Sequence, residues 1–387
     1  MKFYIFSAQY LPTVGGVERY TNSLAKKLIE KGHTVTVVTS ALKDHPRQET
    51  DSDGIDVVRL PVIPLMGGRF PVLKISAQLK EFKKNFALDK PDFCVIQTRF
   101  YTESIMAARL CRKHNIPSMV IEHGTAYLMR GGIMGLAGKI YEHIICRYIH
   151  HKCPDFYGVS QSCCQWLENF GIKTNRVLYN SVTPGVIQKT AESGMSALLC
   201  RLPDDMHNKT VIVFSARFIP EKGVMQLLSA FEKLKRNHKD IVLIMAGDGP
   251  LWQEADAKKG NDVILTGRIP YEESLALIQL GHIFCLPTFS EGFATTVLEA
   301  AALKTYIVTT PTGGTPQLVT GPDCGTLMPD MSEDSIYSAL NDILSDRSAI
   351  QPAVEKTFSS LEQNFTWDIT SEKLIDIAKE KSNRGKR

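Results

Sequence analysis

The sequence lacks a long hydrophobic run and a cysteine framework. No stretch of its 387 residues approaches the ~20 consecutive apolar residues that span a bilayer. The nine cysteines are scattered, none forms a C-x-x-C pair, and Cys163 and Cys164 are adjacent. This spacing favours reduced thiols in a cytoplasmic protein. Because the N-terminus enters a strand-like pattern directly, we expect no signal peptide.

A dinucleotide-binding fingerprint is also missing. Gly15 and Gly16 follow the first expected strand and precede a helix, but their loop is not G-x-G-x-x-G. No acidic residue closes the second strand, so a nicotinamide-dependent dehydrogenase is disfavoured. The two glycines allow the backbone to approach a diphosphate or an acceptor, and a tight structural turn is the alternative.

The composition indicates a globular protein of two domains. The apolar fraction is 43% and the charged fraction 22%, values that are ordinary for soluble domains. The formal charge is uneven, at +9 for residues 1–185 and −5 for residues 186–387. A basic amino-terminal half predicts an anionic ligand or surface on that side, whereas no nucleic-acid-binding module is recognisable.

The order of apolar runs predicts parallel α/β sheets. Short β-type runs alternate with amphipathic helical segments in both halves, which is typical of doubly wound folds. A polar segment from Asn180 to Lys209, broken by prolines and a glycine, is interpreted as the linker. The strands are expected at 2–7, 34–39, 55–60, 93–97, 118–122, 156–160, 211–215, 241–245, 263–265 and 283–287.

The stretch from Ser290 to Glu299 holds the strongest site signal. It follows a buried strand and leads into a helix, so Glu291 and Glu299 flank one strand-to-helix turn. The N-terminus of such a helix attracts phosphate, and a nearby carboxylate suits sugar hydroxyls. The alternative is an ordinary loop acid and a solvated surface glutamate.

Two cations follow another expected strand. Arg217 and Lys222 lie in a strand-to-helix turn, where a guanidinium fork and an ammonium suit a diphosphate. Two exposed surface cations are the alternative. His123 comes directly after the strand at 118–122 and is expected at the ligand-binding edge of its sheet. A satisfied structural histidine is the alternative there.

Two metal-like patterns are interpreted as structural. Asp51 and Asp53 form a D-x-D sequence, but they lie in a polar loop. The residues at 143, 146, 150 and 153 share one helical face, yet a straight helix spreads them over about 15 Å, too far for one zinc ion. We therefore predict no metal site.

Together these residues resemble the retaining glycosyltransferases of family 4, which have the GT-B fold. The resemblance covers nearly the whole chain. The motifs that carry it are Gly15-Gly16-Val-Glu-Arg19, Glu122-His-Gly124, Leu178-Tyr-Asn-Ser-Val182, Ala216-Arg217 with Glu221-Lys-Gly223, the Glu291 and Glu299 pair, and Thr312-Gly-Gly-Thr-Pro316.

The resemblance implies two Rossmann-like, doubly wound domains facing across a cleft, with a UDP- or GDP-linked sugar held mainly by the second. Family members generally need no metal or other cofactor. Ser181 and Gln317 depart from the family's usual Gly and Glu. The implied roles are diphosphate binding by Arg217 and Lys222, ribose binding by Glu299, contact with the sugar hydroxyls by Glu291, further donor contacts from Gly292, Phe293, Ala294 and Thr295, a place near the anomeric centre for His123, and one near the phosphates or acceptor for Gly16.

The expected domains are 1–182 on the acceptor side, 183–367 for the nucleotide sugar, and a helix with a basic tail at 368–387 that crosses back to the first domain. The implied activity is transfer of a hexose-type sugar to a glycan or a polyprenyl- or lipid-linked acceptor, as in bacterial surface polysaccharide, lipopolysaccharide or glycolipid biosynthesis. The alternatives are a sugar-nucleotide epimerase and a non-catalytic sugar-nucleotide-binding subunit.

The segment from Leu128 to Tyr148 predicts contact with a membrane. It mixes large apolar residues with Arg130, Lys139 and Arg147, as basic interfacial helices do. We therefore expect a cytoplasmic protein that associates peripherally with the inner face of an anionic membrane. The alternative is that these apolar residues belong to the core of the first domain.

Overall fold

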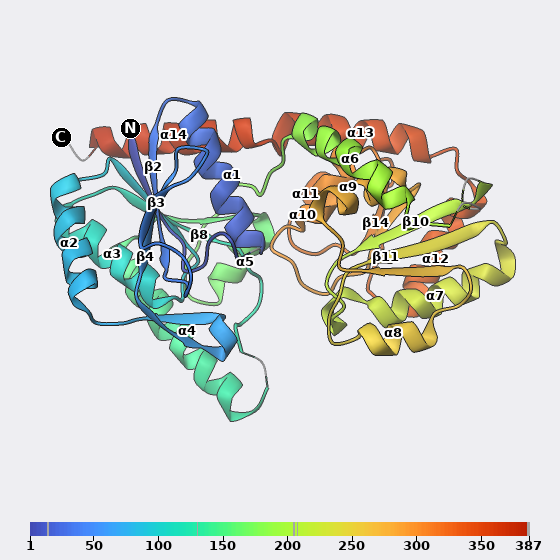
Figure 1. Cartoon of the computed structure of the whole chain (residues 1–387), viewed down its shortest axis with the longest axis horizontal. Coiled ribbons are helices and arrows are strands. Elements are labelled where there is room, and N and C mark those ends of the chain that lie inside the picture. The colour runs from blue at the N-terminus through green and yellow to red at the C-terminus, as the bar shows by residue number, and fades with distance from the viewer. Residues whose placement is uncertain (14, 130, 204–205, 207, 385–387) are drawn as a thin grey trace. The chain divides into compact units, whose positions relative to one another are not determined.

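The chain forms two compact units (Figure 1). The computed structural model describes residues 1–13, 15–129, 131–203, 206 and 208–384. Unit 1 consists of Met1–Asn180 together with the segment from Trp367 onward, and unit 2 consists of Ser181–Thr366. The basic end at 385–387 and Arg130, both included in the expectations above, lie outside the described residues.

Unit 1 is built on a parallel sheet. Its described strands follow the order β3-β4-β2-β1-β7-β8-β9, and only β3 runs antiparallel to its neighbour. The inner strands are buried on both faces, as their continuous apolar runs require. The bounds are β1 Lys2–Phe6, β2 Thr34–Ser40, β3 Gln48–Thr50, β4 Asp56–Leu60, β7 Phe93–Gln97, β8 Ser118–Glu122 and β9 Phe156–Gly158.

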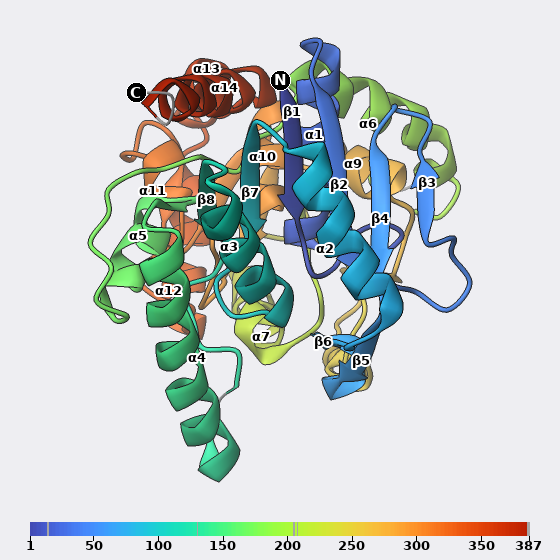
Figure 2. The same ribbon diagram turned by 90° about the vertical axis from the view of Figure 1, so that its left-hand side faces the viewer.

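Helices cover both faces of this sheet (Figure 2). Side chains alternate along β1, so Tyr4 and Phe6 pack with the buried residues of α2, α3 and α4, whereas Phe3 and Ile5 face the other way. The last helix, α14, packs on α1, where Lys31 pairs with Glu372. The helices are α1 Gly16–Glu30, α2 Ala77–Asp89, α3 Thr102–His114, α4 Gly132–Lys152, α5 Gln161–Glu168 and α14 Trp367–Arg384.

A small hairpin between β4 and α2 was not anticipated from the sequence. Strands β5 (Val62–Leu65) and β6 (Phe70–Leu73) pair antiparallel around the short helix η1 (Met66–Gly68). The run before α2 contains three prolines, at 61, 64 and 71, which do not suggest a strand by pattern alone. The two-stranded sheet is separate from the main sheet of unit 1.

Unit 2 repeats the doubly wound architecture. Its strands follow the order β12-β11-β10-β13-β14-β15, and every recorded pairing in this sheet is parallel. The prediction of parallel, doubly wound sheets is therefore confirmed in both units. The strands are β10 Thr210–Ser215, β11 Ile241–Ala246, β12 Val263–Gly267, β13 Ile283–Leu286, β14 Tyr306–Thr309 and β15 Thr326–Leu327. The helical segments are α6 Pro184–Leu199, η3 Pro220–Lys222, α7 Val224–Asn237, α8 Trp252–Lys258, α9 Tyr271–Leu280, α10 Thr295–Ala302, α11 Thr315–Leu318, α12 Glu333–Ser345 and α13 Ile350–Asn364.

The interpretation of residues 180–209 as a linker is wrong. Most of this segment forms α6, a helix of unit 2 that packs on α9. Pro184 occupies the first turn, where its missing N–H has no helical partner to lose, so it begins the helix instead of breaking it. Gly194 lets the two helices approach, because a Cβ there would overlap the Glu272 backbone.

The described part of the chain was also searched for membrane-spanning helices. None of its helices is both long enough and apolar enough to cross a bilayer.

Candidate functional site

In unit 2 the strand order reverses between β10 and β13, which are direct neighbours. Such a switch point opens a crevice at the carboxyl ends of the two strands, where open α/β sheets bind ligands. The loop after β10 carries Arg217 and Lys222, and the loop after β13 carries Glu291. Two loops 69 residues apart in sequence therefore meet at one edge of the sheet.

Lys222 and Glu291 form an ion pair across this switch point. Their side chains are 15% and 18% exposed, so a ligand can still reach both charges. The Thr288 hydroxyl lies 3.4 Å from the same Glu291 oxygen and 3.2 Å from the Glu221 carbonyl oxygen. These contacts hold the two loops against each other.

Gly223 makes the approach of the loops possible. It ends η3 with φ +63°, in the left-handed region that favours glycine. A Cβ at this position would overlap the Pro287 carbonyl oxygen. Any other residue would push the Lys222 turn away from the loop after β13.

Arg217 is the more accessible of the two predicted cations. Its side chain is exposed and makes no ion pair or hydrogen bond with the described residues. Lys222, by contrast, is partly neutralised by Glu291. The structure therefore brings Lys222 and Glu291 into direct contact, while Arg217 lies on the same β10 loop with its charge unpaired.

Glu299 is buried in the second turn of α10, and only 2% of its surface is exposed. The Tyr271 hydroxyl of α9 donates a hydrogen bond of 2.8 Å to its Oε1 atom. The alternative of a solvated surface glutamate is therefore wrong. A buried, oriented carboxylate is what recognition of paired hydroxyls requires, and the role itself remains a prediction.

The turn between Glu291 and α10 is shaped by a second pair of glycines. Gly313 has φ +58°, and a Cβ there would lie 2.5 Å from the Gly292 carbonyl oxygen. A Cβ on Gly314 would overlap the Phe293 ring, which packs edge-on against Phe365. Ala294 precedes the helix, and Thr295 is its first residue. The predicted donor-binding stretch is thus a rigid lead into a helix N-terminus, where partial positive charge favours phosphate.

In unit 1 the strand order reverses between β1 and β7. Gly16 begins α1 beyond β1, and a Cβ placed on it would meet no atom within 4 Å, so this backbone faces open space. Gly15 is tightly packed, because a Cβ there would overlap the Glu18 carboxylate. The two glycines therefore differ in purpose, and only Gly16 offers its backbone to a ligand.

His123 follows β8 and lies close to aromatic and amide groups. Its Nε2 atom is 2.6 Å from Gln97 Oε1, and its ring meets the Tyr20 ring edge-on with centroids 4.7 Å apart. Burial among these groups lowers the pKa of His123 to about 3. The imidazole is consequently neutral near pH 7 and acts as a hydrogen-bonding group there, not as an acid.

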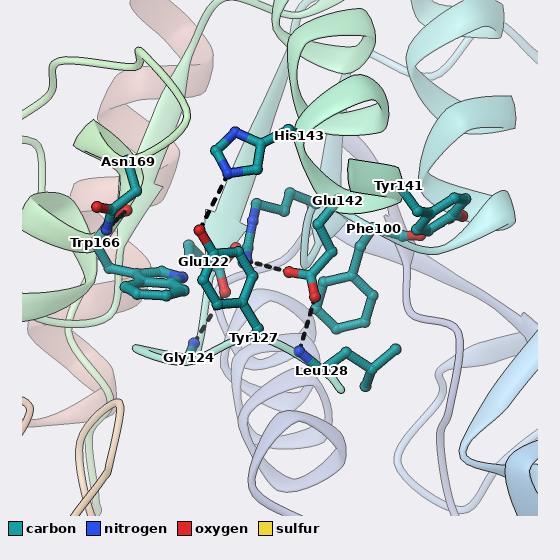
Figure 3. A network of polar contacts seen from close by, with 11 residues as sticks. Phe100, Glu122, Gly124, Tyr127, Leu128, Tyr141, Glu142, His143, Trp166 and Asn169 are labelled. Atoms are coloured by element: carbon teal, nitrogen blue, oxygen red, sulfur yellow. Dashed lines mark hydrogen bonds and ion pairs between the residues drawn. The ribbon is translucent and has the colours of Figure 1, made fainter. Parts of the chain in front are cut away.

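A buried charge network supports the loop that carries His123 (Figure 3). The Arg99 guanidinium pairs with Glu122 Oε2 and Glu142 Oε2, each at 2.6 Å. All three side chains are at most 1% exposed. The second oxygen of Glu122 accepts the Gly124 N–H at 3.0 Å, and that of Glu142 accepts the Leu128 N–H at 2.8 Å.

This network fixes both ends of one loop. Glu122 holds the residue after His123, and Glu142 of α4 holds the far end at Leu128. Between them, the Tyr127 hydroxyl lies 3.1 Å from His143 Nε2. Because Arg99 joins the two carboxylates, the loop from β8 to α4 is tied to β7 as well. Sequence reasoning missed Arg99, although it follows β7 as His123 follows β8.

The two metal-like patterns engage ordinary partners. Asp51 accepts the backbone N–H groups of Asp53 and Ile55, both at 2.9 Å, so its carboxylate caps its own turn. On α4, Cys146 is buried and His143 contacts Tyr127. Among the residues that the structure describes, no group of three or more His, Cys, Asp or Glu is arranged to hold a metal ion.

Comparison with known proteins identifies the family. A sequence profile of Glycosyltransferase Family 4 matches residues 14–185, and one of Glycosyl transferases group 1 matches residues 204–357. An uncharacterized glycosyltransferase of Methanocaldococcus jannaschii is 22% identical over 95% of each chain. A human phosphatidylinositol N-acetylglucosaminyltransferase protein is 22% identical over 95% of this chain and 74% of the human chain.

The fold is shared with solved glycosyltransferases. The structure of Anabaena HepE in complex with UDP-glucose superposes with a TM-score of 0.72 and 14% identity, over 98% of this chain and all of the Anabaena chain. A glycosyltransferase from Rickettsia africae gives a TM-score of 0.74 and 17% identity, over 98% of both chains. The expected GT-B fold with two Rossmann-like domains is therefore confirmed. The chain belongs to glycosyltransferase family 4.

Proposed function

We propose that this protein transfers a hexose-type sugar from a UDP- or GDP-linked donor to a glycan or lipid-linked acceptor, with retention of configuration and without a metal. The observation that carries the proposal is the meeting of Lys222 and Glu291 at the switch point, next to the N-terminus of α10. The structures of HepE with UDP and with UDP-glucose support a nucleotide-sugar donor.

The proposed chemistry is a front-side displacement. The bond between the anomeric carbon and the diphosphate oxygen breaks, and the acceptor oxygen bonds to the same face of that carbon. The acceptor's proton passes to the departing diphosphate oxygen. Arg217, Lys222 and the α10 N-terminus would stabilise the negative charge that develops on the leaving group. No protein nucleophile is required, so the protein's work is positioning and electrostatics.

The remaining predicted residues would orient the donor. Glu291 is proposed to bind hydroxyls of the transferred sugar, and the buried Glu299 those of the ribose. Gly292, Phe293, Ala294 and Thr295 form the turn between these two carboxylates. For His123 of unit 1 we propose contact with the transferred sugar near its anomeric carbon, as a neutral imidazole. Gly16 is proposed to present its backbone to the phosphates or the acceptor.

Helix α4 supports a membrane-resident acceptor. The helix buries Cys146 and Ile149 in unit 1. The other large apolar side chains in its first part, however, face solvent, so the alternative of core packing does not hold for them. Lys139 and Arg147 are exposed on the same helix, and each basic group near an anionic leaflet contributes about 1 kcal/mol. The exposed apolar residues are Ile133, Met134, Leu136, Ile140 and Ile144.

The human relative acts, by its name, on phosphatidylinositol, which is a lipid. Together with α4 this supports peripheral association with the inner face of an anionic membrane, in the assembly of a surface polysaccharide, lipopolysaccharide or glycolipid. Salt should weaken this association, since the electrostatic part is screened within about 10 Å at 0.1 M ionic strength.

A panel of labelled nucleotide sugars, with and without a lipid-linked acceptor, tests the function. We expect labelled lipid only when donor and acceptor are both present, with the anomeric configuration of the donor in the product. Free sugar formed without acceptor would identify an epimerase-type enzyme instead. Binding of the donor without turnover in any combination would identify a non-catalytic subunit.

A further inference from the structure

The hairpin β5–β6 presents apolar side chains outward. Ile63, Leu65 and Met66 are 51%, 46% and 47% exposed, close to the exposure of the α4 apolar residues. The tip turns through Gly67 and Gly68, which have φ +65° and +86°, and a Cβ on either would meet no atom within 4 Å. The tip is therefore a narrow projection that packs against nothing on that side.

The base of the hairpin, by contrast, is firmly attached. Gln9 donates a hydrogen bond of 2.8 Å to the Gly68 carbonyl oxygen, and Leu73 N–H donates one of 2.9 Å to Thr102 Oγ1. The Phe70 ring packs on Tyr101 and Tyr141, with centroid distances of 5.7 and 5.8 Å. Tyr141 belongs to α4, so the hairpin and α4 are in contact. In Figure 2 both lie at the lower edge of unit 1.

The charge around the hairpin has one sign. Residues 57–80 contain no acidic side chain. Arg69, beside the tip, and Lys74 and Lys80, where the chain enters α2, are positively charged. Ile75, directly after Lys74, is 87% exposed. Apolar side chains flanked by cations alone match an anionic bilayer, in which the side chains enter the acyl boundary and the cations meet the headgroups.

We propose that the hairpin tip, Leu65 and Met66, inserts into an anionic membrane surface as a second docking element beside α4. This inference rests on the membrane association proposed above and names the part of the protein that enters the lipid. A single helix can rotate on a membrane, whereas two elements in contact fix the orientation of unit 1.

The attachment of the hairpin gives this docking a consequence for the substrate. Gln9 lies in the loop between β1 and Gly16, and its bond to Gly68 links that loop to the tip. When the tip enters the bilayer, the carboxyl edge of the unit 1 sheet comes to rest near the headgroups. The acceptor is then a lipid whose polar group stays in the interface while it reacts.

Flotation with vesicles of phosphatidylglycerol and phosphatidylcholine tests the inference. The variant pair is Leu65→Ser with Met66→Ser. The matched control is Val186→Ser with Leu199→Ser on α6, whose side chains are 59% and 43% exposed in unit 2. We expect the hairpin variant to lose about tenfold in its partition coefficient, the scale of removing two partly buried apolar side chains. The control should partition like the wild type.

A second variant keeps the test valid if the serine pair does not fold. In Met66→Trp, brominated lipids should quench the introduced tryptophan when anionic vesicles are added. Wild-type partitioning of the serine pair, or an introduced tryptophan that stays unquenched in vesicle-bound protein, overturns the hairpin proposal and leaves the membrane proposal standing. If the wild type itself does not bind anionic vesicles at low salt, both proposals fail.

Discussion

The two units use the same kind of sheet edge for charged groups in opposite ways. In unit 2, Lys222 and Glu291 are 15% and 18% exposed and pair where a ligand can separate them. In unit 1, the Arg99 guanidinium and its two carboxylates are at most 1% exposed. A ligand reaches the first set and cannot reach the second. Charge at a switch point therefore serves binding in one unit and loop support in the other.

Burial decides the cost of breaking each set. Removing one partner from a buried ion pair leaves an uncompensated charge in a medium of low polarity. An accessible pair loses little, because water replaces the missing partner. The predictions below separate the two units on this basis.

The largest effect is expected for Arg99→Met. Without the guanidinium, Glu122 and Glu142 remain buried and unpaired, which should lower the free energy of unfolding by about 3–5 kcal/mol. Urea denaturation at pH 7 measures the loss. Lys222→Met, in the accessible pair, serves as the control and should cost less than about 1 kcal/mol. Equal losses for the two variants would mean that burial does not distinguish the units.

The next effect concerns transfer instead of stability. Lys222→Ala and Glu299→Ala should each lower kcat/KM by the loss of one charge-assisted contact, about 1.5–3 kcal/mol, or roughly ten- to a hundredfold. Both variants should fold, as circular dichroism can verify. Lys233→Ala on the exposed side of α7 should retain activity. Wild-type efficiency in either folded site variant would rule out the assigned donor site.

A smaller effect is expected at a buried acid of unit 1. Glu103 is 3% exposed, and neither carboxylate oxygen has a hydrogen-bond partner in the described part of the chain. Burial raises the pKa of Glu103 well above its ordinary value. The folded state therefore favours the protonated carboxyl, and its stability contribution is full at low pH and lost as the pH rises through the raised pKa.

Glu103→Gln should accordingly stabilise the protein at pH 8 and have little effect at pH 4. A gain of about 1 kcal/mol would raise the thermal midpoint by about 2–4 °C. The exposed Glu81→Gln serves as the control and should change the midpoint at neither pH. A midpoint that falls at pH 8 would show that the ionised carboxylate is stabilised by its surroundings.

The smallest effect is expected for metal removal. The Asp51 carboxylate already accepts two backbone N–H groups, so it is not arranged for a cation. Transfer should proceed unchanged in EDTA, and Asp51→Asn with Asp53→Asn should respond in the same way. If activity stopped on chelation and returned with manganese or magnesium, this D-x-D sequence would have to be reconsidered as a metal site.

The positions of the strands and the candidate charges could be predicted from the sequence. A buried parallel strand reads as a short apolar run, and the residues directly after it must lie at the carboxyl edge of the sheet. His123, Arg217 and Glu291 were found in this way. The motif resemblance then supplied their expected roles, which no local pattern contains.

The packing of particular residues could not be predicted. Pro184 and Gly194 suggested a linker, because local sequence does not show whether a proline begins a helix or whether a glycine admits a neighbouring helix. Arg99 was missed, since its partners Glu122 and Glu142 are 23 and 43 residues away in sequence.

By itself the sequence determined the alternation of strands and helices and the chemistry at the ends of the strands, because both depend on neighbouring residues and their periodicity. Only the tertiary structure decided which charges are reachable and which apolar faces remain open. Glu299 became buried and Ile140 exposed on helices of similar local pattern. Exposure depends on which elements pack against a helix, and those elements come from distant parts of the chain.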